Sequence, residues 1–152
     1  MSNEKYQTIS NLLLETDSYT RSKCIVLSKS VDCSWFKEND KYVTDNLLKT
    51  ISSHISKNWT TIIILARKQY LSYLYKWFDG FDEKRPNKEG EEKFIKKLAP
   101  YHIFVSFEEG KYKYCGVTIN DEKMMDRFGG HTLDAYIGAN GKLLYNELFF
   151  NG

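Results

Sequence analysis

Three residues of this chain have the types found together in a cysteine hydrolase site. Cys33 lies in the segment Asp32–Phe36, His131 opens a predicted strand, and Asn146 follows later in the same predicted hairpin. An imidazole beside a thiol lowers the thiol pKa and yields a nucleophilic thiolate, and an amide bonded to the ring holds it in place. These residues are the catalytic candidates that the sequence offers.

The order of cysteine, strand histidine and asparagine resembles that of papain-like cysteine proteases and their small hydrolase relatives. The resemblance rests on the short segments around the three residues. It implies hydrolysis by a thiolate at Cys33, with His131 as the base and Asn146 as the residue that orients the imidazole.

The register of the hairpin predicted over 131–150 decides whether the side chains of His131 and Asn146 meet. Asn140-Gly141 is a preferred dipeptide of two-residue turns. A turn there separates His131 from Asn146 by four residues of strand, about 13 Å. A turn at Gly138-Ala139 would instead place them opposite each other. We therefore favour no catalytic set and keep the cysteine hydrolase as an alternative.

Other chemistry-bearing residues predict neither a metal site nor a cofactor. His54 flanks the apolar stripe of a helix, and His102 faces away from the core in its strand. Cys24, Cys33 and Cys115 are far apart in the chain and form no CxxC pair, so we expect reduced thiols in an intracellular protein. The glycines match no phosphate-binding pattern.

The composition indicates one folded domain over residues 1–152, with an exposed charged loop at 79–92. Aromatic residues reach 15% of the chain, which a disordered protein would not contain. Its 22 basic and 20 acidic residues nearly cancel. No apolar segment has the length of a membrane span, and the N-terminus carries no apolar leader, so we expect a cytoplasmic protein with no membrane partner.

Hydrophobic periodicity predicts the elements that would position these residues. Helices are expected over 4–15, 41–57, 66–78 and 91–99, the second of them with an apolar stripe of helical spacing. Buried strands are expected over 24–27 and 60–65, although the latter could begin the next helix. The order of these two strands in the sheet stays open.

Residues 101–119 predict a hairpin that turns at Glu109-Gly110 and pairs Glu108 with Lys111. Its core face would hold the residues Tyr101, Ile103, Val105, Phe107, Tyr112 and Tyr114. The predicted fold class is therefore α+β, with N-terminal helices packed on a mainly antiparallel sheet formed by two C-terminal hairpins.

Surplus aromatic residues favour a binding protein over an enzyme. Tyr73, Tyr75 and Tyr136 lie off the apolar stripes, and exposed aromatic side chains are common interface anchors. Basic residues surround the first two, and together they form a predicted binding patch of Arg67, Lys68, Tyr73, Tyr75 and Lys76. We expect a small intracellular module that recognises another protein, as an immunity protein, an antitoxin or an inhibitor does.

Nucleic-acid or nucleotide binding is a further alternative. Arg67 and Lys68 precede a tyrosine, and Lys111 and Lys113 alternate with tyrosines in a predicted strand. Basic residues interleaved with aromatic ones can hold phosphates and stack bases.

Overall fold

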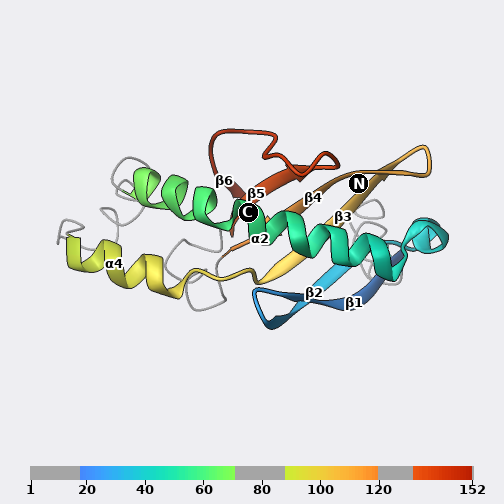
Figure 1. The fold of residues 1–152 in the computed structure, drawn as a ribbon, viewed down its shortest axis with the longest axis horizontal. Helices are drawn as coiled ribbons and strands as arrows, with labels where there is room; N and C mark the ends of the chain where they lie inside the picture. The colour runs from blue at the N-terminus through green and yellow to red at the C-terminus, as the bar shows by residue number, and fades with distance from the viewer. Residues whose placement is uncertain (1–17, 71–87, 120–131, 152) are drawn as a thin grey trace, which may run out of the picture.

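The computed structural model describes residues 18–70, 88–119 and 132–151. In these ranges the chain forms one six-stranded sheet whose strands lie side by side in chain order (Figure 1). Neighbouring strands are antiparallel, except that β2 and β3 are parallel. The strands are β1 (Tyr19–Val26), β2 (Lys29–Phe36), β3 (His102–Glu108), β4 (Lys111–Thr118), β5 (Thr132–Gly138) and β6 (Phe149–Asn151). The α+β class with a mainly antiparallel sheet is confirmed.

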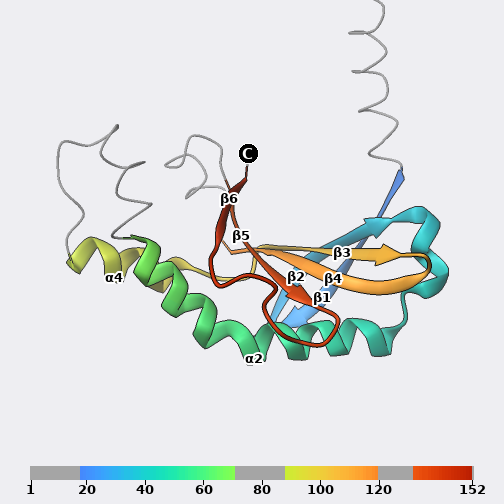
Figure 2. The same ribbon diagram turned by 90° about the horizontal axis from the view of Figure 1, so that it is seen from above.

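Helices follow β2, and the longest of them lies on one side of the sheet. A short 3-10 helix, η2 (Lys37–Tyr42), leads into the long helix α2 (Asp45–Gln69), which runs along one face of the sheet (Figure 2). The Thr44 hydroxyl accepts a hydrogen bond from the Leu47 amide at 3.0 Å and so caps the first turn of α2. Helix α4 (Lys88–Lys97) lies beside the C-terminal part of α2. Because β2 and β3 are parallel, a crossover connection must join them, and these helices are part of it.

The core lies between the sheet and α2. Side chains that are fully buried come from alternate positions of the strands and from one stripe of the helix. The largest are Val26, Ile51, Ile55, Ile62, Ile103, Val105, Val117, Leu133 and Ile137, together with Ile119, which directly follows β4. We call the side of the sheet that faces α2 the inner face, and the opposite side the outward face.

The predicted strand over 60–65 is wrong, because these residues belong to α2. Ile62 is fully buried and Leu65 nearly so, whereas Ile64 is 58% exposed, which is a helical pattern. The stripe of the predicted helix 41–57 thus continues at helical spacing into residues 66–69. Packing of this stripe on the sheet outweighs the strand preference of the β-branched run.

A third hairpin, β1–β2, precedes the helices, so the predicted arrangement needs correction. Residues 24–26 of the predicted strand 24–27 end β1, which begins earlier at Tyr19, and the unassigned residues after the turn form β2. Leu27 and Ser28 make the turn with φ of 51° and 64°. These are left-handed values that favour glycine or asparagine, so the residues at this turn do not signal it.

The hairpin predicted over 101–119 is confirmed as β3–β4, including the pairing of Glu108 with Lys111. A bulge lies beyond that pair: Phe107 pairs with Tyr112, but Ser106 pairs with Tyr114. The extra residue moves Tyr114 to the outward face and brings Cys115 into the core instead. Tyr101 and Tyr114 were predicted on the core face, and both positions are wrong, because Tyr101 precedes β3 and is 39% exposed.

The second predicted hairpin exists, but its register differs from the prediction. The Gly141 amide donates to the Gly138 carbonyl at 2.9 Å, so Ala139 and Asn140 are the central residues of the turn. Gly141 follows with φ of 82°, which is the usual bulge after a type I turn. Residues 144–148 then leave the ladder, and pairing resumes in β6, where Leu133 lies opposite Phe150. We call residues 144–148 the 144–148 excursion, and Asn146 lies in it.

Of the remaining predicted elements, some lie within the described residues and others lie outside them. The helix expected over 91–99 is confirmed as α4, which begins earlier, at Lys88. Residues 88–92 are therefore helical, and Glu91 is buried, so this part of the predicted exposed loop 79–92 is wrong. The helix over 4–15, the part of 66–78 after residue 70 and the part of the loop 79–92 before residue 88 lie outside the described residues.

Candidate functional site

The outward face of the sheet carries mainly aromatic and polar side chains. In the part of the chain that the structure describes, no helix covers this face (Figure 2). Its aromatic residues gather in two groups, one near each edge of the sheet. The N-terminal aromatic cluster is Tyr19, Phe36 and Phe104, and the C-terminal aromatic cluster is Tyr114, Tyr136, Tyr145 and Phe149.

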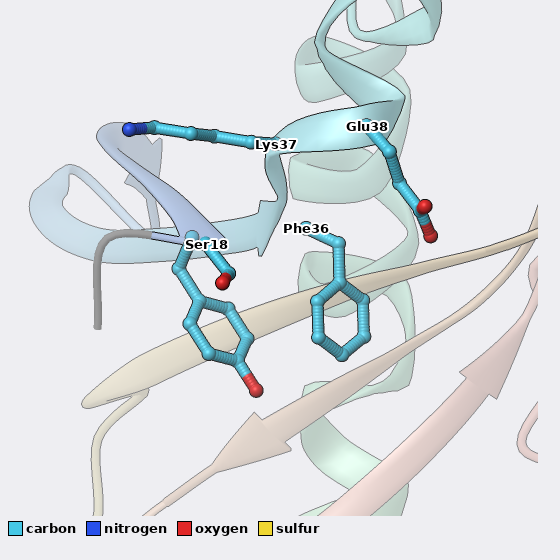
Figure 3. Close-up of a pocket in the computed structure, with 5 residues that line it drawn as sticks. Ser18, Phe36, Lys37 and Glu38 are labelled. Carbon is cyan, nitrogen blue, oxygen red and sulfur yellow. The ribbon is translucent and has the colours of Figure 1, made fainter. Parts of the chain in front are cut away.

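The N-terminal aromatic cluster forms where β1, β2 and β3 run side by side. The rings of Tyr19 and Phe36 stack with centroids 4.8 Å apart, and Phe104 meets both rings edge-on. A hollow of about 550 Å³ beside them is bordered by Ser18, Tyr19, Phe36, Lys37 and Glu38. In Figure 3 the ammonium group of Lys37 points away from the Phe36 ring. This hollow is therefore aromatic on one side and open at its charged rim.

The C-terminal aromatic cluster surrounds a hollow of about 400 Å³ over β4, β5 and the 144–148 excursion. The Tyr136 ring lies 6.0 Å from Tyr114, 6.1 Å from Tyr145 and 5.7 Å from Phe149, each in an edge-on arrangement. Leu144 also lines the hollow and is 49% exposed, and Tyr145 is 52% exposed. Water therefore reaches a contiguous apolar surface at this site.

A buried carboxylate fastens the short strand β6 beneath this cluster. One oxygen of Asp134 accepts a hydrogen bond from Thr118 at 2.7 Å, and the other accepts from Thr132 and Asn151. The Asn151 amide also donates to the Tyr136 hydroxyl at 2.9 Å. These bonds satisfy a carboxylate that is only 9% exposed, and they hold the Tyr136 ring in place.

A serine–histidine contact lies between the two clusters. The Ser34 hydroxyl is 3.0 Å from His102 Nε2, and Ser34 is buried. Burial lowers the pKa of His102, although Asp32 and Asp134 oppose that shift. The hydrogen bonds of the Asp134 carboxylate go to other residues, so that carboxylate does not orient the ring as in a catalytic triad.

Side chains from α2 hold the loop that carries the exposed part of the C-terminal cluster. The Gln69 amide donates to the Leu148 carbonyl at 2.9 Å and accepts from the Leu148 amide at 2.7 Å. Asn58 donates to the Gly141 carbonyl at 2.8 Å. A Cβ atom on Gly141 would lie 2.9 Å from the His54 ring, so glycine permits this approach. The hollow is thus built on an anchored loop.

The structure does not bring Cys33 and Asn146 together. Cys33 points from β2 into the core, with its Sγ atom 3.1 Å from that of Cys24. Its hydrogen bond with Cys24 and its burial both raise its pKa, which is the opposite of what a thiolate nucleophile requires. Asn146 is exposed beyond β5, and β3 and β4 lie between β5 and β2. His131 lies outside the described residues.

The predicted patch on the helix is described only in its first two residues. Arg67 forms an ion pair with Glu91 at 3.4 Å and a second with Glu92, so it links α2 to α4. Lys68 is exposed. Tyr73, Tyr75 and Lys76 lie outside the described residues, and the patch stays a prediction.

The basic residues considered for nucleic-acid binding do not form one surface. Lys113 pairs with Glu108 at the β3–β4 turn, and the Tyr42 ring at the end of η2, just before α2, packs against Gly110 in that turn. Arg67 lies near the other end of α2, about 33 Å away along the helix. A single stretch of nucleic acid therefore finds no continuous cationic track over these residues.

Sequence reasoning identified part of the outward face. Tyr136 was expected off the apolar stripe, and His102 was expected to face away from the core; both positions are confirmed. Tyr19, Phe36, Tyr145 and Phe149 were missed. The alternation of Tyr19, Arg21 and Lys23 with Cys24 and Val26 was a usable signal for β1.

Within the described ranges, no helix has the length and apolarity needed to cross a membrane. No group of three acidic, histidine or cysteine residues there could hold a metal ion. No protein-family model, curated protein or solved structure that was compared with the chain matches it.

Proposed function

We propose that this protein is a binding module that recognises another protein through the outward face of its sheet. The observation that carries the proposal is the C-terminal aromatic cluster with its exposed hollow. Leu144 and Tyr145 are about half exposed there, although they sit on a loop that Gln69 and Asn58 fasten to α2. A rigid apolar hollow rimmed by tyrosine is a typical anchor site for a partner side chain.

The charges of the face support a protein partner over a nucleic acid. Lys23 is paired with Asp32 at 2.7 Å, and Asp134 is a buried carboxylate between the aromatic clusters. A polyanion would need a cationic surplus, whereas a protein segment with an apolar anchor residue needs none. An immunity protein, an antitoxin or an inhibitor would act through such a surface.

A photo-cross-linking experiment tests the proposal in cells of the source organism. Benzoyl-phenylalanine replaces Tyr145, which borders the hollow, or Tyr101, which precedes β3 and is 39% exposed. We expect a discrete protein adduct from position 145 and none from position 101. Adducts of equal intensity from both positions, or an adduct with RNA or DNA, would contradict the proposal.

Paired substitutions then measure the contribution of the hollow to binding the cross-linked protein. Leu144→Ser and Tyr145→Ser should each weaken binding by about 2 kcal/mol, because anchors at a desolvated centre carry most of the interface energy. Tyr101→Ser is the matched control. Since Leu144 and Tyr145 are about half exposed, melting temperatures should change little.

A further inference from the structure

Two cysteines face each other across the β1–β2 hairpin, on the inner face. Cys24 lies opposite Val31 and Cys33 opposite Ser22, so the thiols are diagonal neighbours on adjacent strands. Their Sγ atoms are 3.1 Å apart, and both thiols are free. A disulfide bond requires about 2.05 Å, so an approach of about 1 Å joins them without a change of register.

A hollow at the edge of the core leads to one of the two thiols. It has a volume of about 340 Å³ and lies between β1 and α2, where Cys24, Leu48, Lys49 and Ser52 line it. Cys24 is 5% exposed and Cys33 is 1% exposed. A small oxidant therefore reaches the Cys24 sulfur first, and Cys33 stands behind it.

We propose that Cys24 and Cys33 form a peroxide-reactive dithiol in which Cys24 is attacked and Cys33 resolves. The Cys24 sulfur attacks one oxygen of hydrogen peroxide, the O–O bond breaks, and the other oxygen leaves as water after taking up the thiol proton. The resulting sulfenic acid is then attacked by the Cys33 sulfur. The S–S bond forms, the S–O bond breaks, and a second water leaves with the Cys33 proton.

The pairing also distinguishes the two sulfurs electrostatically. The hydrogen bond between the two thiols lowers the pKa of Cys24, while the same bond and burial raise the pKa of Cys33. Cys24 is thus the better nucleophile of the pair. Cys115 is fully buried, and burial raises its pKa to about 11, so it serves as an internal control.

The test uses the full chain in its native state, treated with hydrogen peroxide, quenched with catalase, unfolded and alkylated. The chain has three cysteines. We expect the number of alkylated cysteines to fall from three to one, a mass loss of about 2 Da before alkylation, and a peptide that links Cys24 to Cys33. The Cys115→Ser variant should form the same bond at the same rate.

The Cys33→Ala variant separates the two steps. Without the resolving thiol, Cys24 should accumulate as a sulfenic acid that dimedone traps, while Cys115 remains a thiol. Three alkylated cysteines in treated wild type, a bond that involves Cys115, or reaction only after unfolding would each overturn the proposal. The wild-type result stands whether or not Cys33→Ala folds.

Discussion

The two faces of the sheet are built from different residues and impose different demands on the sequence. On the inner face, Ile103, Val105 and Ile137 are fully buried against α2. On the outward face, the alternate positions hold rings packed edge-on and polar groups joined by hydrogen bonds. The inner face is explained by folding alone. The outward face exposes apolar area that folding does not require, and this excess supports the proposed role in recognising a partner.

The largest difference in stability should appear when an isoleucine is truncated to alanine on each face in turn. Ile103 is fully buried in β3, whereas Ile25 in β1 is 65% exposed. Ile103→Ala leaves a cavity and should lower the free energy of unfolding by about 3 kcal/mol. Ile25→Ala should cost about 1 kcal/mol or less, because it loses only strand preference. Urea unfolding measures both, and equal losses would show that the two faces do not differ in this way.

A smaller effect should follow from cutting the tie between α2 and the loop of the C-terminal cluster. Gln69→Ala leaves the amide and carbonyl of Leu148 buried without partners, which should cost about 2 kcal/mol. Gln69→Glu keeps the acceptor for the Leu148 amide and should lose less. Amide hydrogen exchange at Leu148 should accelerate in Gln69→Ala.

The control for this variant is Thr61→Ala, an exposed position on the same helix. It should leave both the unfolding free energy and the exchange at Leu148 unchanged. If Gln69→Ala behaved like Thr61→Ala, the loop would be held by other contacts, and the anchoring of the hollow by Gln69 would be wrong.

A pH-dependent effect of moderate size should come from the outward face. Burial lowers the pKa of His102 and also that of His54 on α2. The unfolded chain binds these protons near pH 6.5, above the folded values. The contribution that neutral His102 makes to the free energy of unfolding is therefore complete above about pH 6.5, and it is lost as the pH falls below that value.

Unfolding free energies measured between pH 7 and pH 5 test this sign. Wild type should lose stability over the interval, His102→Gln should lose less, and His54→Gln should account for a separate part of the loss. NMR titration of the His102 ring should give a midpoint below the ordinary value. A midpoint above it would show that the neighbouring carboxylates Asp32 and Asp134 outweigh burial.

Sequence reasoning works where a local signal and the packing agree. The β3–β4 hairpin is confirmed because Glu109-Gly110 supplies the two left-handed residues that its turn needs, with φ of 51° and 77°. It fails where tertiary packing decides. The β-branched run over 60–65 is helical because its buried residues continue the stripe that begins at Ile51 and Ile55.

The site was harder to predict than the fold because irregularities in the strands decide which side chains reach the outward face. A single extra residue near Tyr112 moves Tyr114 to the outward face, and the 144–148 excursion brings Tyr145 over Tyr136. Periodicity alone has no means to locate such insertions, since every position after them changes face. The cysteine pair was hidden for a related reason, because the turn at Leu27 and Ser28 has left-handed φ values without glycine or asparagine to signal them.

The smallest expected effect on stability concerns the ion pair between Lys23 and Asp32, at the edge of the outward face. Both side chains are more than half exposed, so the attraction is screened and offset by side-chain ordering. Lys23→Gln should leave the urea midpoint unchanged, as should raising the salt concentration for wild type. The hydrogen bond and charge of Lys23 lower the pKa of Asp32, so NMR titration of Asp32 in Lys23→Gln should show a higher midpoint. A large loss of stability would mean that this edge of the outward face stabilises the fold as the inner face does.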